Sequence, residues 1–226
     1  MGRINYYLNG VDIRTFGVHV SAAKGLLSIP ERKEGISHSY DDEHGISVDV
    51  SAGYVKERKI TLSCFTDKMS ATDFAATLNT FKLWLLDSGL FQLRVDLGGG
   101  SPLAYMVYWS GKCDITAHYD GAKRVGTFDL QLVEPEPVKR VWLIESTAVN
   151  QQIEIELTEG LSGKHYSIYW GDGAVTRDIT SGNAPTHTYT SAGTYYILLT
   201  NADSALTTAV SGDTHTEESE LWNILL

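Results

Sequence analysis

The sequence predicts a mainly β protein with one α-helix, arranged as two successive units. Short segments in which apolar and polar residues alternate recur along the whole chain, as expected of half-buried strands. One stretch, residues 70–88, instead has the 3.6-residue period of a helix. The motif Glu134-Pro135-Glu136-Pro137 removes backbone donors and stiffens the chain, so sheet pairing should stop there. We therefore expect a β-barrel or split barrel with the helix over residues 1–137, and a β-sandwich over residues 138–226.

The first unit is predicted to open with a β-hairpin, because Asn9-Gly10 supplies the two positive φ angles of a type I′ turn between apolar residues. Residues 18–50 are polar and contain several glycines, and we expect a long mobile loop there. Within it, residues 46–50 alternate as a short strand does. Residues 59–65 alternate in the same way and predict another strand.

The predicted helix carries a single apolar stripe, formed by Phe74, Leu78, Phe81 and Leu85. Ser70, with Asp73 three positions later, is a variant capping box at its start. Gly89 stands where a C-terminal cap is expected.

Strands are expected to resume directly after the helix. Residues 91–97 and 103–109 flank the flexible connection Gly98-Gly99-Gly100-Ser101-Pro102. Residues 112–119 and 124–133 flank Asp120-Gly121, a second hairpin signal.

The second unit consists of strands and turns, and six or seven short strands at this spacing favour a sandwich. The clearest strands are residues 139–144, 153–157, 166–170 and 193–200. The chain ends on the apolar residues 221–226, which either pair as a last strand or dock on a neighbouring subunit.

Charge and composition exclude several classes of protein. The formal net charge is −10, of which residues 140–226 carry −8 with three Lys or Arg against eleven Asp or Glu. Nucleic-acid recognition requires clustered Lys and Arg, so we expect none. No apolar run approaches the roughly 18 residues of a membrane span, and the N-terminus does not have the pattern of a signal peptide. Cys64 and Cys113 are expected as buried free thiols, although a bridge between them stays open.

Candidate chemical motifs do not form a recognisable active site. Asp41-Asp42-Glu43-His44 is the most acidic cluster, but four consecutive residues in a polar loop predict solvated side chains without the spacing of a Ca²⁺ loop. The glycines of residues 98–100 precede a proline and a strand, whereas a phosphate loop precedes a helix. We expect no catalytic residue, no metal, no cofactor and no enzymatic activity.

The second unit resembles the PKD-type domain, a small immunoglobulin-like sandwich. The resemblance is carried by three motifs in the family's order: W-G-D-G, then H-x-Y, then G-T-Y at the start of a strand. It implies a structural role for these residues, with the glycine-rich turn held by its aspartate and the tryptophan in the core. The residues that carry it are Trp170, Gly171, Asp172, Gly173, His187, Tyr189, Gly193 and Tyr195.

The first unit resembles the N-terminal domain of siphophage distal tail proteins, over about residues 4–137. The features in order are the early hairpin, Phe16-Gly17-Val18, a long loop, a strand, one helix, a strand pair and a final Phe-x-Leu-x-Leu strand running into Pro135. In that family this domain builds a hexameric ring coaxial with the tail tube. The usual peripheral domain is a galectin-like sandwich, so the PKD-like unit departs from the family.

These resemblances imply a structural component of a virion or prophage tail, a baseplate hub assembled in the bacterial cytoplasm. Its expected partners are copies of itself in a ring, other tail and baseplate proteins, and a host-surface glycan. The long loop of residues 18–50 and the terminus of residues 221–226 are the candidate subunit contacts. The alternative is a carbohydrate- or protein-binding surface module built on the PKD-like unit.

Overall fold

Alternating sequence segments become strands on both sides of the Pro-x-Pro motif, and the helical segment becomes the one α-helix of the described chain. The computed structural model describes residues 4–35, 37–39, 41–42, 44–49, 53–98, 102–111, 113–203 and 205–212, and the backbone of residues 222–223. The mainly β fold class predicted from the sequence is confirmed.

The N-terminal sheet has nine strands among the described residues, and its main path runs β2-β1-β8-β9-β11-β6-β3. β7 and β10 also pair with β11. All pairings are antiparallel, and the path is open from β2 to β3, so the described strands do not close into a barrel. The strands are β1 (Asn5–Leu8), β2 (Val11–Asp12), β3 (Val18–Lys24), β6 (Arg58–Thr66), β7 (Met69–Ser70), β8 (Leu90–Asp96), β9 (Leu103–Trp109), β10 (Thr116–Asp120) and β11 (Lys123–Glu134).

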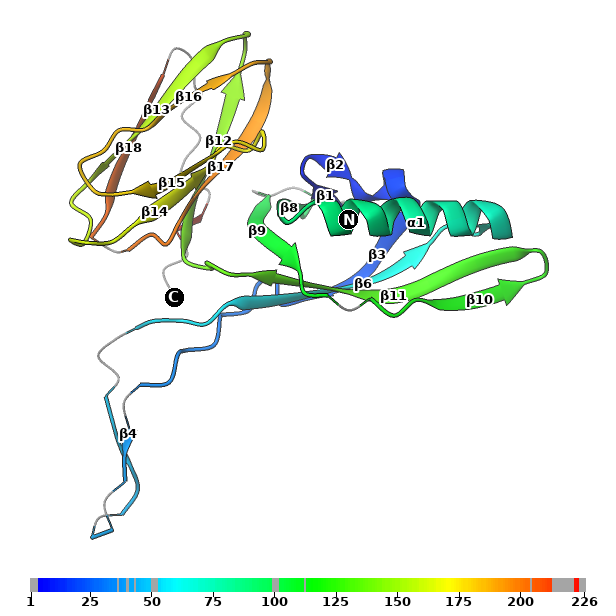
Figure 1. Cartoon of the computed structure of the whole chain (residues 1–226), viewed down its shortest axis with the longest axis horizontal. Helices are drawn as coiled ribbons and strands as arrows, with labels where there is room; N and C mark the ends of the chain where they lie inside the picture. The colour runs from blue at the N-terminus through cyan, green and yellow to red at the C-terminus, as the bar shows by residue number, and fades with distance from the viewer. Residues whose placement is uncertain are drawn as a thin grey trace.

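The first hairpin and the helix form as predicted. Asn9 and Gly10 have φ angles of 46° and 78°, the left-handed pair that the turn between β1 and β2 requires. A 3-10 helix, η1 (Ile13–Phe16), follows β2. Helix α1 (Ala71–Asp87) lies along one face of the sheet and buries Leu78, Phe81 and Leu85 against it (Figure 1). The Ser70 side chain accepts a hydrogen bond from the backbone N–H of Asp73, so the predicted cap is present.

Two boundaries differ from the sequence predictions. Residues 18–24 were expected in the loop but form β3, which pairs with β6 through a register shift between Val20 and Ala22. Their side chains are mostly small and polar, because β3 lies at the end of the pairing path and is only partly buried. This composition makes the strand difficult to recognise in the sequence. Strand β10 begins at Thr116 rather than at position 112, which lies outside the described residues.

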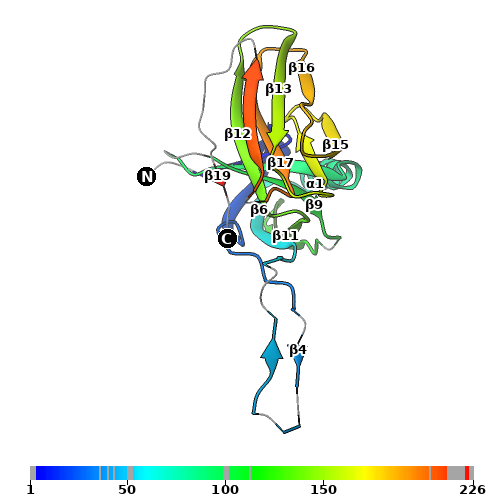
Figure 2. The ribbon, with the colours of Figure 1, turned by 90° about the vertical axis from the view of Figure 1, so that its left-hand side faces the viewer.

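The C-terminal half consists of two sheets, with orders β15-β14-β17-β12-β19 and β16-β13-β18. Their inner faces enclose a separate apolar core that includes Trp170, Tyr166 and Ile155. The two sheets lie on one side of the N-terminal sheet, and the long hairpin between β3 and β6 extends from the other side (Figures 1 and 2). The strands are β12 (Lys139–Ser146), β13 (Gln151–Thr158), β14 (Tyr166–Tyr169), β15 (Val175–Ile179), β16 (Thr186–Tyr189), β17 (Gly193–Thr200), β18 (Thr207–Gly212) and β19 (Trp222–Asn223).

The end of the chain is described only at β19, whose backbone pairs with Arg140 and Val141 of β12. Of the two alternatives for residues 221–226, this short pairing is the last-strand arrangement. The other four residues of that segment lie outside the described part of the chain.

A third, smaller apolar cluster joins the two halves. Ala104 and Met106 of β9 pack against Val141, Tyr196 and Leu198 of the C-terminal half. The side-chain amide of Gln92 donates to the backbone oxygen of Tyr196 across this contact, at 2.9 Å.

Candidate functional site

The most prominent surface feature is a hairpin between β3 and β6, which we call the arm (residues 27–57). Figures 1 and 2 show its described parts extending far from the N-terminal sheet. Its two limbs are antiparallel, with β4 (Ser37–His38) paired to β5 (Ser47–Val48). Closer to the sheet, the N–H of Lys33 donates to the oxygen of Tyr54 at 2.9 Å, and the N–H of Lys56 donates to the oxygen of Glu31 at 2.7 Å. The described part of the arm is therefore a two-stranded ribbon in which most residues are exposed.

Large apolar side chains of the arm are exposed to solvent. Leu27 is 73% exposed and Ile29 is 78% exposed, both on the outgoing limb. Ile46, Val48 and Tyr54 on the returning limb are also exposed. Single exposed apolar residues are common on protein surfaces, but a projecting hairpin that carries five of them presents a surface suited to a partner.

The acidic cluster lies at the far end of this arm. Asp41, Asp42 and His44 are exposed, and Glu43 lies outside the described residues. Across the described part of the chain, no group of three His, Cys, Asp or Glu side chains is placed to hold a metal ion. The exposed positions of Asp41 and Asp42 match the expectation of solvated acids.

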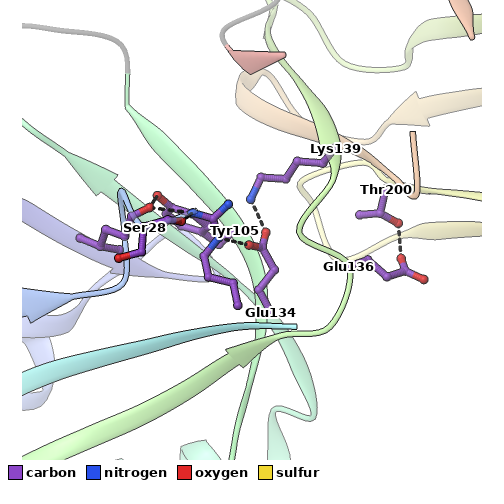
Figure 3. Close-up of polar contacts among 8 residues, drawn as sticks. Ser28, Tyr105, Glu134, Glu136, Lys139 and Thr200 are labelled. Carbon is purple, nitrogen blue, oxygen red and sulfur yellow. Dashed lines mark hydrogen bonds and ion pairs between the residues drawn. The ribbon is translucent and has the colours of Figure 1, made fainter. Parts of the chain in front are cut away.

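The root of the arm is fixed by a buried charged cluster, which we call the junction cluster (Arg58, Glu134 and Lys139). These side chains are 4%, 1% and 2% exposed, respectively. Arg58 Nε donates to Glu134 Oε2 at 2.9 Å. Lys139 Nζ donates to the other oxygen of the same carboxylate, Oε1 (Figure 3). One carboxylate therefore binds two cations from different strands, β6 and β12.

Arg58 and Tyr105 connect the junction cluster to the outgoing limb of the arm. Arg58 Nη1 donates to the backbone oxygens of Leu26 and Ser28, at 3.1 and 2.7 Å. The hydroxyl of Tyr105 donates to the same Leu26 oxygen at 2.7 Å. Because Arg58 begins the strand that follows the arm, these bonds hold both limbs together at their base.

The electrostatics of the junction cluster are dominated by burial. Burial lowers the pKa of Lys139 to about 8, an effect that the Glu134 carboxylate only partly opposes. The ring of Tyr105 faces the ammonium, with Lys139 Nζ 4.1 Å from its centroid. Burial also raises the pKa of the Tyr105 hydroxyl. The cluster thus holds two basic groups and one acid away from water.

The connection between the two halves is held at a further point. The Glu136 carboxylate, between the two prolines, accepts a hydrogen bond from the hydroxyl of Thr200 at the end of β17 (Figure 3). The linker is therefore tied to the C-terminal half, while Glu134 belongs to the N-terminal sheet.

Sequence reasoning missed the junction cluster, although a signal for it exists. In β11 the buried residues Phe128, Leu130 and Leu132 alternate, and Glu134 is the next position on that face. In β6, Arg58 shares the buried face of Ile60 in the same way. Strand periodicity therefore places both charges inside the protein, and Glu134 is directly opposite Arg58 in the β11–β6 register.

The motif residues of the C-terminal half lie together around one turn. Gly171 and Gly173 have φ angles of 89° and 98°, and the Asp172 carboxylate accepts the N–H of Ala174 at 2.9 Å. The other Asp172 oxygen lies 2.8 Å from Nε2 of His187 on β16. The Asp172–His187 pair therefore fastens the turn to the opposite sheet.

Aromatic stacking continues from this turn across the sandwich. The His187 ring stacks on Trp170 with centroids 5.0 Å apart, and it lies nearly perpendicular to the Tyr189 ring with centroids 4.8 Å apart. Tyr189 stacks on Tyr195 at 3.9 Å. Gly193 begins the strand that carries Tyr195, and the atoms nearest to where its Cβ would lie belong to the Tyr195 side chain, at 3.5–3.6 Å. This arrangement joins the two sheets, and we infer a structural role for all eight motif residues.

A hollow of about 440 Å³ lies beside the root of the arm. Its lining side chains are apolar or hydroxyl-bearing, including Tyr6, Val20, Leu26 and Leu103. Such a lining offers no acid–base pair for catalysis.

The two cysteines are both free thiols, Cys64 buried and Cys113 half-buried. No helix in the described part of the chain is long and apolar enough to cross a membrane.

The chain was compared with known proteins. No family model matches it, and no curated protein matches it. The Dit protein (gp 19.1) of phage SPP1, titled a paradigm of hub adsorption apparatus in phages that infect Gram-positive bacteria, is 11% identical, with a TM-score of 0.45 over 94% of this chain and 96% of that one. A chain of the phage p2 baseplate in its activated conformation is 8% identical, with a TM-score of 0.46 over 89% of this chain and 99% of that one.

Proposed function

We propose that the chain is a structural tail protein that assembles with copies of itself into a ring at the distal end of a phage tail tube. The observation that carries this proposal is the arm: a projecting hairpin with exposed apolar side chains and a base fixed by buried charges. A rigidly anchored hairpin with exposed apolar side chains gains stability when a neighbouring molecule covers it.

In the proposed ring, the arm of one copy docks on a different part of the next copy, which makes the contact head-to-tail. Head-to-tail contacts close into rings when the rotation between copies permits. The sequence resemblance to distal tail proteins supports a hexamer, and other tail and baseplate proteins would bind its two faces. The location that follows is the virion tail.

The chain is proposed to divide into a ring-forming domain, residues 1–137, and a PKD-like domain, residues 138–226. The separate apolar cores on either side of the linker support this division. Because the C-terminal sheets and the arm lie on opposite sides of the N-terminal sheet, a ring joined through the arm leaves the PKD-like domain free to project outward (Figure 2). The proposed role is scaffolding rather than catalysis.

Light scattering after gel filtration tests the proposal. The wild-type chain should elute at a mass several times its 24.9 kDa. The double variant I29D/I46D places two charges on the arm and should shift the protein to the monomer. The matched variant L83D/L86D introduces the same charges at exposed positions of α1 and should leave the assembly intact. A monomeric wild type at high micromolar concentration, or an arm variant that still assembles, would contradict the proposal.

A further inference from the structure

The junction cluster contains an imbalance that its structural role does not require. Arg58 and Lys139 both bind Glu134, so two basic groups share one acid at exposures of 4% or less. A buried ion pair of one base and one acid would hold the same strands together. The additional cation is Lys139, the first residue of β12 in the C-terminal half.

The groups that face Lys139 come from each element packed against it. Glu134 of β11 attracts its ammonium, Arg58 of β6 repels it, and the ring of Tyr105 on β9 lies beneath it. Glu136 of the linker is bound to Thr200 (Figure 3). The loss of hydration exceeds the attraction by Glu134, so the protonated amine is less favourable here than in water.

The described residues of the two halves also meet away from the junction cluster. The chain crosses between them once, through residues 135–138. Met106 and Ala104 pack against Val141, Tyr196 and Leu198, and the Gln92–Tyr196 hydrogen bond accompanies this contact. The Arg94 guanidinium also lies 5.0 Å from the centroid of the Tyr196 ring. Interfaces between the domains of one chain commonly permit relative motion.

We propose that Lys139 makes this junction a proton-sensitive hinge, in which protonation favours an open form with Lys139 in water and deprotonation favours the closed form described here. The proposal does not depend on ring assembly. The moving part is the C-terminal half, because Arg58 keeps Glu134 and the Leu26 and Ser28 oxygens when Lys139 leaves. The root of the arm therefore stays in place.

The direction of the pH effect follows from linkage. In the closed form the pKa of Lys139 is about 8, whereas an exposed lysine keeps the ordinary value of 10.5. Between these pH values the open form binds more protons, so the ratio of open to closed molecules falls about tenfold for each unit of rising pH. Below about pH 8 Lys139 is protonated in both forms, so the ratio of open to closed molecules is at its highest and no longer depends on the titration of Lys139.

Fluorescence energy transfer between two dyes, one on each half, measures the opening of the hinge in the 226-residue chain. One dye is placed at N79C on the exposed face of α1 and the other at V149C in the exposed loop after β12, with C113S removing the half-buried thiol. Mean transfer efficiency should shift between pH 7 and pH 10 and approach the closed-form value at the higher pH. K139M, which keeps the length of the side chain without its charge, should give the closed-form value throughout.

The control variant K123M removes an exposed lysine from β11 and should retain the wild-type pH response. Circular dichroism at each pH establishes that every variant remains folded. A wild-type efficiency that does not change with pH would overturn the proposal. So would a K139M protein that responds to pH as the wild type does.

Discussion

The hydroxyl of Tyr189 donates a hydrogen bond to the backbone oxygen of Trp170 at 2.8 Å, and both residues are fully buried. This bond joins β16 to the turn that follows β14, across the core of the C-terminal half. Burial, reinforced by Asp172 and Tyr195, raises the pKa of the Tyr189 hydroxyl, so the group stays protonated and remains a donor.

The variant Y189F should lower the free energy of unfolding by about 1–3 kcal/mol, because a buried carbonyl loses its partner while the ring packing is kept. Urea denaturation measures the change. The control Y119F removes a hydroxyl from a side chain that is 73% exposed and should have an effect near zero. Equal stability of Y189F and the wild type would show that this hydrogen bond is not a significant constraint.

Two glycines of the same turn differ in the space around them. A Cβ on Gly171 would lie 2.8 Å from the backbone oxygen of Tyr196, whereas a Cβ on Gly173 meets no heavy atom within 4 Å. Both have positive φ, so both alanine variants are strained by about 1 kcal/mol. G171A should be destabilised by several kcal/mol more than G173A, because backbone atoms must move. Similar midpoints in thermal unfolding would contradict this difference.

The junction cluster predicts a large effect for one carboxylate. E134A leaves Arg58 and Lys139 buried without their acid, and breaking such a pair typically lowers stability by about 3–5 kcal/mol. E57A removes an acid from the exposed pair with Lys59 and should change stability by less than about 1 kcal/mol. Chemical denaturation of the two variants compares them directly, and equal effects would refute the assigned importance of Glu134.

The two thiols should differ in reactivity toward a disulfide reagent at pH 8. Burial raises the pKa of Cys64 to about 12, and it also raises the pKa of Cys113, which is only half-buried. In the native protein Cys113 should react slowly, whereas Cys64 should react only after denaturant is added. Equal reaction rates of the two thiols in the native protein would contradict the structure. So would a denatured protein in which neither thiol reacts unless a reductant is added.

Local sequence signals predicted much of the fold. Asn9-Gly10 determines its hairpin through φ angles, and the stripe of Leu78, Phe81 and Leu85 forms the buried face of α1, because both depend on neighbouring residues alone. Strand β3 was missed because its Ser-Ala-Ala-Lys segment resembles a loop, and its position follows from pairing with residues about forty positions later.

The candidate site was predictable only in part. The sequence pointed to residues 18–50 as a subunit contact, and the arm occupies most of that range. The junction cluster depends on Arg58 and Glu134, which are 76 positions apart and have the charge of surface residues. Strand alternation places both side chains on buried faces, but their pairing follows from strand register and from the halves packing together, which no local pattern specifies.

Cross-linking between copies tests the self-assembly through the arm most directly. Equal amounts of unlabelled and ¹⁵N-labelled chain are mixed, treated with an amine cross-linker and analysed by mass spectrometry, with Lys33 and Lys56 as the reactive positions on the arm. We predict cross-linked peptides from Lys33 or Lys56 that pair the two isotopes, and their loss in I29D/I46D. Cross-links from the arm that join only peptides of the same isotope would show that it does not bind a second copy.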